Sequence, residues 1–152
     1  MSFKSMIHDI KVTPLKIIED KRGKVMHMLR KDSSVFSNFG EIYFSTIYFN
    51  AIKAWHLHKE SYLNYACPVG EVKIVLFDDR PNSKTKGMYQ EIILGKKNYS
   101  LITIPPNIWN GFKGIDKNES LIANCLTIPH NEKEMVRKDP FDNSFNYDWN
   151  KK

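Results

Sequence analysis

The chain contains 152 residues, of which 41% are hydrophobic, and this length predicts one domain over residues 1–152 with a core of its own. No apolar run approaches the roughly 20 residues of a membrane span, and charged residues interrupt the N-terminus, so we expect a cytoplasmic protein without a membrane partner. The net charge of +6 is scattered, without the basic and aromatic clusters of nucleic-acid binding, which favours an anionic small molecule as partner.

The first third of the chain predicts a hairpin followed by a buried strand. Residues 10–18 are expected to form a first strand, and a turn that ends at Gly23 leads to a second strand over residues 24–30. A single helical turn is expected over residues 33–39. Residues 41–50 are apolar on both faces, which predicts a strand covered on both sides, either between two sheets or at a subunit contact.

The rest of the chain predicts many short strands joined by closely spaced turns. These strands cover residues 52–60, 61–68, 71–77, 89–94, 99–104, 111–114 and 121–127. A polar loop is expected over residues 78–87 and a short helix over residues 131–136. The pattern is typical of an all-β sandwich or barrel. Cys67 and Cys125 lie in apolar surroundings, which indicates buried free thiols.

Two histidines on one strand are the main candidates for chemistry. Alternate side chains of a strand share a face, so His56 and His58 point the same way, with Glu60 after them. Trp55 and Leu57 point the other way, towards packing. The alternative interpretation of this stretch is a partly exposed polar face without a function.

The same stretch is compatible with a cupin-like metal site, but the ligand pattern is incomplete. Glu60 follows His58 after a single residue, where such sites leave more room. The position expected for a later histidine ligand is occupied by Asn110, and an amide is a poor ligand for first-row metals. We therefore expect no metal and no cofactor.

Acid–base catalysis is the chemistry that remains, because motifs for nucleophilic catalysis and for phosphate-binding glycine loops are absent from the sequence. A catalytic histidine needs a carboxylate to orient its ring and raise its basicity. The candidates are Glu60, Asp78, Asp79 and Asp139, and the sequence alone does not choose among them.

Several motifs together resemble the dTDP-4-dehydrorhamnose 3,5-epimerase family of nucleotide-sugar epimerases. The matching segments are Asp20-Lys21-Arg22-Gly23, Lys53-Ala54-Trp55-His56, Asp78-Asp79-Arg80-Pro81-Asn82-Ser83-Lys84-Thr85-Lys86-Gly87, residues 98–112 and Lys138-Asp139-Pro140. The central decapeptide is the most specific of them, since it fits Asp-x-Arg-x-x-Ser-x-Thr-x-Gly without a gap. The match covers most of the chain.

The resemblance implies a cupin-type double-stranded β-helix, or jelly-roll, barrel with an N-terminal hairpin. It implies that His56 removes a proton α to the 4-keto group of a nucleoside-diphosphate 4-keto-6-deoxy sugar, in deoxysugar or surface-polysaccharide synthesis, and that Asp139 holds the imidazole. It also implies a homodimer that exchanges N-terminal strands, without a cofactor. The candidate substrate-binding residues are Arg22, Ser45, Lys53, Trp109 and Asn110.

The departures from the family pattern concern the acid. The run that should carry the family's tyrosine is Leu126-Thr127-Ile128-Pro129, and the family's lysine falls near Leu63 or Asn64. Water, His58, Tyr62 or Tyr65 would then return the proton, and His58 is the preferred candidate because it shares the face of His56. A 3,4-ketoisomerase-like enzyme and a non-catalytic sugar-nucleotide-binding protein remain as alternatives.

Three candidates also have ordinary structural interpretations. Asp139 is suited to cap a loop, Arg80 to form a structural salt bridge, and Trp109 to pack in the core rather than to stack on a base or sugar.

Overall fold

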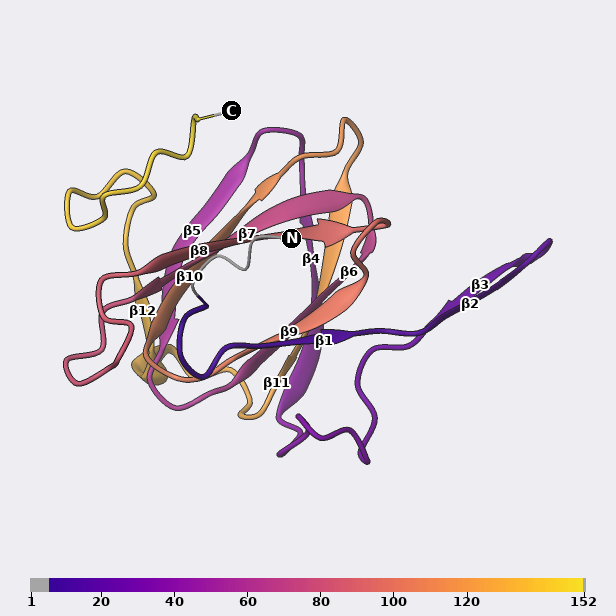
Figure 1. Ribbon diagram of the computed structural model, residues 1–152, viewed down its shortest axis with the longest axis horizontal. Helices are drawn as coiled ribbons and strands as arrows, with labels where there is room; N and C mark the ends of the chain where they lie inside the picture. Colours follow the sequence, from indigo (N-terminus) through magenta and orange to yellow (C-terminus); the bar gives the residue numbers. More distant parts are fainter. Residues whose placement is uncertain (1–5, 152) are drawn as a thin grey trace.

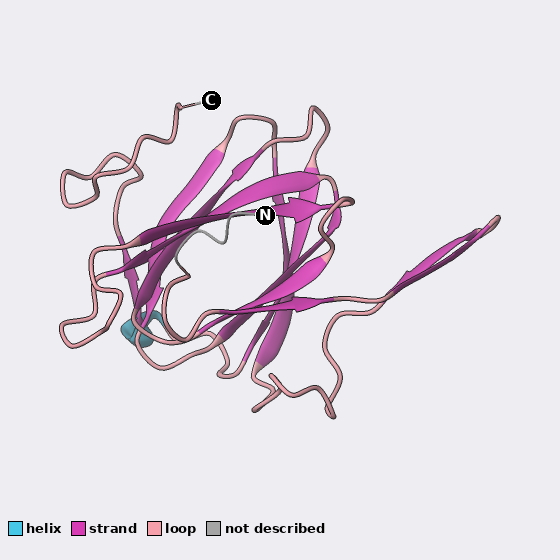
Figure 2. Ribbon diagram, viewed as in Figure 1, coloured by secondary structure: helices cyan, strands magenta, loops and turns pink. Residues whose placement is uncertain are grey.

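The computed structural model describes residues 6–151 as two five-stranded antiparallel sheets that face each other, with a hairpin projecting from one side (Figure 1). In spatial order, the first sheet contains β1 (Lys11–Pro14), β9 (Ser100–Ile104), β6 (Leu63–Val69), β11 (Ser120–Leu126) and β4 (Glu41–Ile47). The second contains β12 (Met135–Arg137), β5 (Ile52–His58), β10 (Ile108–Gly114), β7 (Glu71–Asp78) and β8 (Tyr89–Gly95). The hairpin consists of β2 (Ile17–Asp20) and β3 (Gly23–Met26), and the one helical element among the described residues is the 3-10 turn η1 (Glu132–Glu134) (Figure 2).

The all-β prediction is confirmed, but several elements differ from those expected. The stretch 10–18 contains two strands, because β1 pairs with β9 while β2 alone pairs with β3 in the hairpin. Residues 33–35 form a bend and a turn, and residues 36–39 have no regular structure, instead of the expected helical turn. The helix expected over 131–136 shortens to η1 before the chain extends as β12. The strand β12 escaped prediction because three residues carry too little periodicity to reveal it.

The main core lies between the two sheets, where the inward side chains of alternating strands meet. Ile74, Leu76, Leu94, Ile102 and Ile122 are all inaccessible to solvent. Burying an aliphatic side chain of this size contributes about 1.5–3 kcal/mol, so this layer fixes the spacing of the two sheets. The free thiols of Cys67 and Cys125 are buried as predicted.

A second, aromatic cluster covers the outer face of the second sheet. Trp55 is fully buried there and stacks on Phe145, with ring centroids 4.4 Å apart, and Trp149 lies beside it. This contact confirms that Trp55 faces away from the histidines of the same strand. The C-terminal segment therefore braces the back of β5.

The decapeptide 78–87 forms a loop held by one buried carboxylate. Asp78 is inaccessible to solvent and accepts hydrogen bonds from Arg80 Nε (2.9 Å), Ser83 Oγ (2.6 Å) and Thr85 Oγ1 (2.7 Å). These donors hold the pKa of Asp78 well below its usual range although burial opposes them. Arg80 also bonds Asp9 at 3.0 Å, so it serves as the structural ion pair that the sequence offered as one alternative.

Candidate active site

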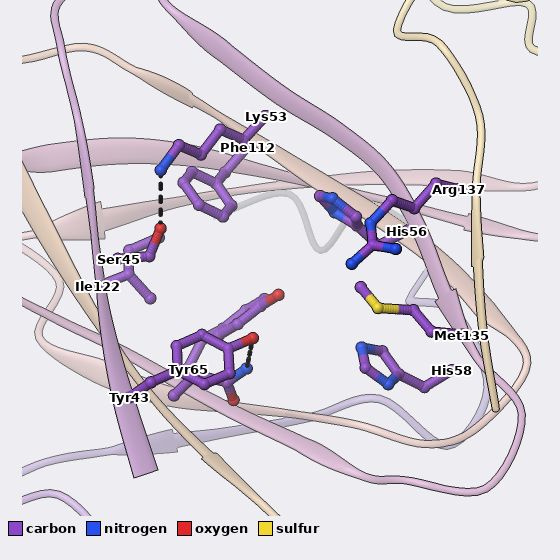
Figure 3. Close-up of a pocket in the computed structure, with 11 residues that line it drawn as sticks. Tyr43, Ser45, Lys53, His56, His58, Tyr65, Phe112, Ile122, Met135 and Arg137 are labelled. Carbon is purple, nitrogen blue, oxygen red and sulfur yellow. Dashed lines mark hydrogen bonds between the residues drawn. The ribbon is translucent and has the colours of Figure 1, made fainter. Parts of the chain in front are cut away.

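A cavity of about 200 Å³ opens between the two sheets and contains both histidines (Figure 3). The first sheet lines it with Tyr43 and Ser45 of β4, Tyr65 of β6, and Ile122 and Asn124 of β11. The second lines it with Lys53, His56 and His58 of β5, Phe112 of β10, and Met135 and Arg137 of β12. None of these lining residues is a carboxylate, so the cavity is electropositive.

His56 and His58 face the cavity from the same wall, as the strand alternation predicts. Asn110 of β10 pairs with His56 across the two strands, and its Nδ2 donates to the His56 carbonyl at 3.1 Å. The Asn110 Oδ1 accepts from the hydroxyl of Tyr65 at 3.1 Å. Asn110, which stands where a metal ligand was considered, therefore supports the backbone of β5 at His56 and accepts the hydroxyl proton of Tyr65.

Lys53 reaches the cavity because β5 contains an irregularity. Simple alternation from His56 would turn Lys53 to the outer face, but the pairing with β10 shifts register between Asn110 and Phe112. Gly111 permits this, since a Cβ there would lie 2.4 Å from the Cβ of Ala54. The Lys53 ammonium donates to Ser45 Oγ at 3.0 Å, which brings these two predicted substrate-binding residues together.

The environment of His56 favours the neutral imidazole. Burial, followed by the positive charges of Arg137, His58 and Lys53, lowers the pKa of His56 to about 4. No side chain in the described part of the chain hydrogen-bonds to the ring of His56. At neutral pH the side chain of His56 is therefore a neutral imidazole that lines the cavity.

His58 has a carboxylate partner that sequence reasoning missed. Its Nδ1 bonds to Oε1 of Glu134, and both side chains are 6% exposed. Glu134 Oε2 also accepts from the backbone N–H groups of Glu60 (3.2 Å) and Ser61 (3.3 Å). The partners are 76 positions apart in sequence, and no local pattern marked Glu134.

Besides Asn110, which does not line the cavity, three predicted site residues lie outside it. Asp139 is exposed, and its Oδ1 accepts from the backbone N–H of Phe141 at 2.8 Å, which is the loop cap that the sequence left open. Trp109 packs on the outer face against Phe145, with ring centroids 5.2 Å apart. Arg22 lies in the turn that joins β2 to β3 and is paired with Asp20. The roles assigned to Asp139, Trp109 and Arg22 stay predictions.

Glu60 lies beyond the end of β5 and is exposed, so it does not share the inward position expected from alternation. Within residues 6–151, no three side chains among His, Cys, Asp and Glu are grouped closely enough to hold a metal ion. The described residues also contain no helix that is long and apolar enough to cross a membrane.

Comparison with known proteins agrees with the fold. The family model described as dTDP-4-dehydrorhamnose 3,5-epimerase matches residues 4–152. The chain belongs to this family. A dTDP sugar isomerase from Desulfovibrio desulfuricans has a structure with a TM-score of 0.92 and 38% identity, covering 94% of this chain and 92% of that one.

Two further relatives of this epimerase family member act in glycan synthesis, as their names state. A probable low-salt glycan biosynthesis epimerase from Haloferax volcanii is 34% identical over 123 residues, 80% of this chain and 79% of that protein. A spore coat polysaccharide biosynthesis protein from Bacillus subtilis is 30% identical over 147 residues, 95% of this chain and 97% of that protein.

Membership of the family confirms the predicted cupin-type barrel and the predicted class of enzyme. The protein is an isomerase of the nucleotide-sugar epimerase class, acting on nucleotide-linked 4-keto-6-deoxy sugars. Tyr43 and Arg137 are among the residues of this epimerase's cavity that sequence reasoning missed. Neither lies in one of the matching segments. Arg137 stands opposite His56 because β12 pairs with β5, and Tyr43 faces the cavity because the two sheets pack against each other.

Proposed function

We propose that His56 is the base that removes a proton α to the 4-keto group of a nucleoside-diphosphate 4-keto-6-deoxy sugar. The observation that carries this proposal is a neutral imidazole inside a cavity lined by cations and by no carboxylate. A base must be unprotonated at the working pH, and the enolate that it creates needs positive charge nearby. Both conditions are met at His56.

Lys53 and Arg137 are suited to stabilise negative charge on the substrate. Lys53 uses two of its three N–H donors on Ser45 Oγ and the carbonyl of Thr46 (2.7 Å), which leaves one for a ligand. Arg137 is paired with Glu132 at 2.8 Å outside the cavity, while it also lines the cavity beside His56. We assign the developing enolate oxygen and the diphosphate to these two cations.

The size of the cavity indicates that only part of the substrate enters it. Sites for whole drug-sized ligands occupy roughly 300–1,000 Å³, which exceeds the about 200 Å³ found here. The sugar would therefore enter the cavity, and the diphosphate and nucleoside would lie along its rim. The names of the relatives favour surface-polysaccharide or glycan synthesis as the process served.

A 3,4-ketoisomerase-like reaction is the second candidate. It is favoured by the position of His56 and His58 on one wall, because two groups on one side can move a proton along a single face of an enediol. The products distinguish the two reactions, since ketoisomerisation moves the carbonyl group and epimerisation inverts a carbon.

The proposal includes a homodimer located in the cytoplasm. β4 lies at the edge of its sheet, and Phe44 on its outward face is 68% exposed. The hairpin projects away from the two sheets (Figure 1). It also exposes apolar side chains, with Ile18 at 49% and Val25 at 59%. Exposed apolar strands of this kind are typical of an interface. Pairing of each hairpin with the partner subunit would carry Arg22 towards the partner's cavity.

Deuterium uptake from heavy water tests the proposal. The protein is incubated with 4-keto-6-deoxyhexoses linked to dTDP, UDP and GDP, and the sugars are followed by NMR. We expect label at C3 or C5 with the wild type and with the control His130→Asn, which changes an exposed histidine outside the cavity. His56→Asn should abolish the label. Tight binding without any label in the wild type would instead indicate a non-catalytic binding protein.

A further inference from the structure

Inversion of a carbon requires an acid on the side of the substrate opposite the base, and two phenols, Tyr43 and Tyr65, line that side. Tyr43 belongs to β4 of the first sheet, whereas His56 belongs to β5 of the second. Both side chains line the cavity, and the hydroxyl of Tyr43 points into it from the wall facing the two histidines (Figure 3). With a side chain 39% exposed, Tyr43 remains within reach of solvent protons.

The hydrogen bonds around Tyr43 leave its own proton available. Asn124 Oδ1 accepts from the backbone N–H of Asn64 at 3.2 Å, which turns the Asn124 amide nitrogen towards Tyr43. That nitrogen donates to the Tyr43 hydroxyl oxygen at 3.0 Å. No acceptor for the hydroxyl proton of Tyr43 is present among residues 6–151. The proton is therefore free to be donated to a ligand in the cavity.

The other proton donors of the cavity are less well placed. His58 lies on the same strand and face as His56, so it approaches a bound sugar from the side of the base. Tyr65 is 5% exposed, and its hydroxyl proton is donated to Asn110. Ser45 is a far weaker acid than a phenol, and its oxygen accepts from Lys53.

We propose that Tyr43 is the general acid that completes epimerisation, a role that rests on the proposed function of His56. His56 takes the α proton, and the C–H electrons form the enolate, whose charge resides on the 4-oxygen. The carbonyl then re-forms as the α carbon takes the hydroxyl proton of Tyr43 on its other face. The step leaves a tyrosinate and a protonated imidazole, which exchange protons with solvent before the next turnover.

The surroundings of Tyr43 suit both of its protonation states. Burial raises the pKa of Tyr43, and the negative charge of Glu41 acts in the same direction, which keeps the phenol protonated before the reaction. The Asn124 N–H and the charge of Arg137 act in the opposite direction. The same two groups stabilise the tyrosinate after the proton has left. Arg137 also influences the pKa of His56, so one guanidinium lies close to both the base and the acid.

The decisive experiment separates proton removal from inversion in Tyr43→Phe, which retains the ring and loses only the hydroxyl. Deuterium uptake and epimer formation are measured together by NMR on dTDP-4-keto-6-deoxyglucose in heavy water. We expect epimer formation to fall at least 100-fold while label still enters with retained configuration through His56. The matched control is Tyr48→Phe, since Tyr48 is 69% exposed and does not line the cavity.

The outcomes distinguish the two proposals. Epimer formation by Tyr43→Phe at the wild-type rate would overturn the role of Tyr43 and leave that of His56 intact. Loss of both label and epimer in a folded Tyr43→Phe protein would overturn the assignment as an acid, since proton removal would then need Tyr43 too. Absence of label in the wild type would overturn the role of His56 and, with it, that of Tyr43.

Discussion

Catalysis should continue at a pH where an ordinary histidine would already be protonated. The acid limb of kcat/KM reports the pKa of the base in the free enzyme, and burial together with neighbouring cations lowers the pKa of His56 to about 4. At pH 5.5 about 97% of such a group is neutral, against about 9% of a histidine with the unperturbed pKa of about 6.5. Between pH 7.5 and pH 5.5 we therefore expect kcat/KM to change little, where an ordinary histidine would cause about a tenfold loss.

A charge variant tests the cause of this shift. Arg137→Gln removes one of the cations that disfavour the imidazolium, so the acid limb should move upwards, but less than all the way, because burial contributes most. Lys138→Gln is the matched control, because Lys138 bonds Ser144 Oγ on the outer side of the sheet and does not line the cavity. Its acid limb should coincide with that of the wild type.

The assay measures initial rates of epimer formation from pH 4 to 8 at low substrate concentration, with circular dichroism at each pH to confirm the fold. An acid limb near pH 6.5 in a folded wild-type protein would refute the reasoning, since the cavity would then not disfavour the imidazolium. The folded state should also lose stability as the pH falls from about 6.5 to about 4, because over this range the unfolded chain binds the proton that folded His56 excludes.

The remaining predictions concern stability and assembly. Asp78→Asn breaks a buried ion pair and should lower the free energy of unfolding at pH 7 by about 3–5 kcal/mol in urea, while the exposed neighbour Asp79→Asn should stay within about 0.5 kcal/mol. The loss should shrink below about pH 4, because the depressed pKa of Asp78 stabilises the fold only above the pKa of the unfolded carboxyl; a pH-independent loss would contradict this. Glu134→Gln weakens the buried bond to His58 and should cost about 1–3 kcal/mol in the same assay, whereas an unchanged midpoint would show that the pair does not stabilise the fold. Phe44→Glu should convert the proposed dimer to a monomer in light scattering, and a dimer that persists would place the interface elsewhere.

Local pattern was sufficient to predict most of the strands and the face that the histidines share. The alternation around Trp55 and His56 is a property of a single strand, and it held because one side packs against the aromatic cluster and the other lines the cavity. The prediction of a single strand over residues 10–18 was wrong because a continuous β-rich stretch does not reveal where the chain changes pairing partner from β9 to β3. Pairing between strands is a long-range property.

The predictions of site residues succeeded where a local motif marked the residue and failed where its position depends on long-range pairing. Lys53 was predicted from a family motif and not from strand alternation, which would have placed its side chain on the outer face. The irregular pairing with β10 explains its position in the cavity. Glu134 and Tyr43 approach the histidines from elements far away in sequence, and neither has a distinctive neighbour. Such residues become visible only when the sheets are assembled.

The placement of the cavity between two sheets has a consequence for stereochemical fidelity. Phe112 and Ile122 line the cavity and also belong to the main core, so the same interior side chains set the gap between the wall of His56 and the wall of Tyr43. Closely packed interiors resist changes of even one methylene. A substitution in the core can therefore alter the ratio of retained to inverted sugar although it changes no group that transfers a proton. Sequence change in the hydrophobic interior is then a route to a new product.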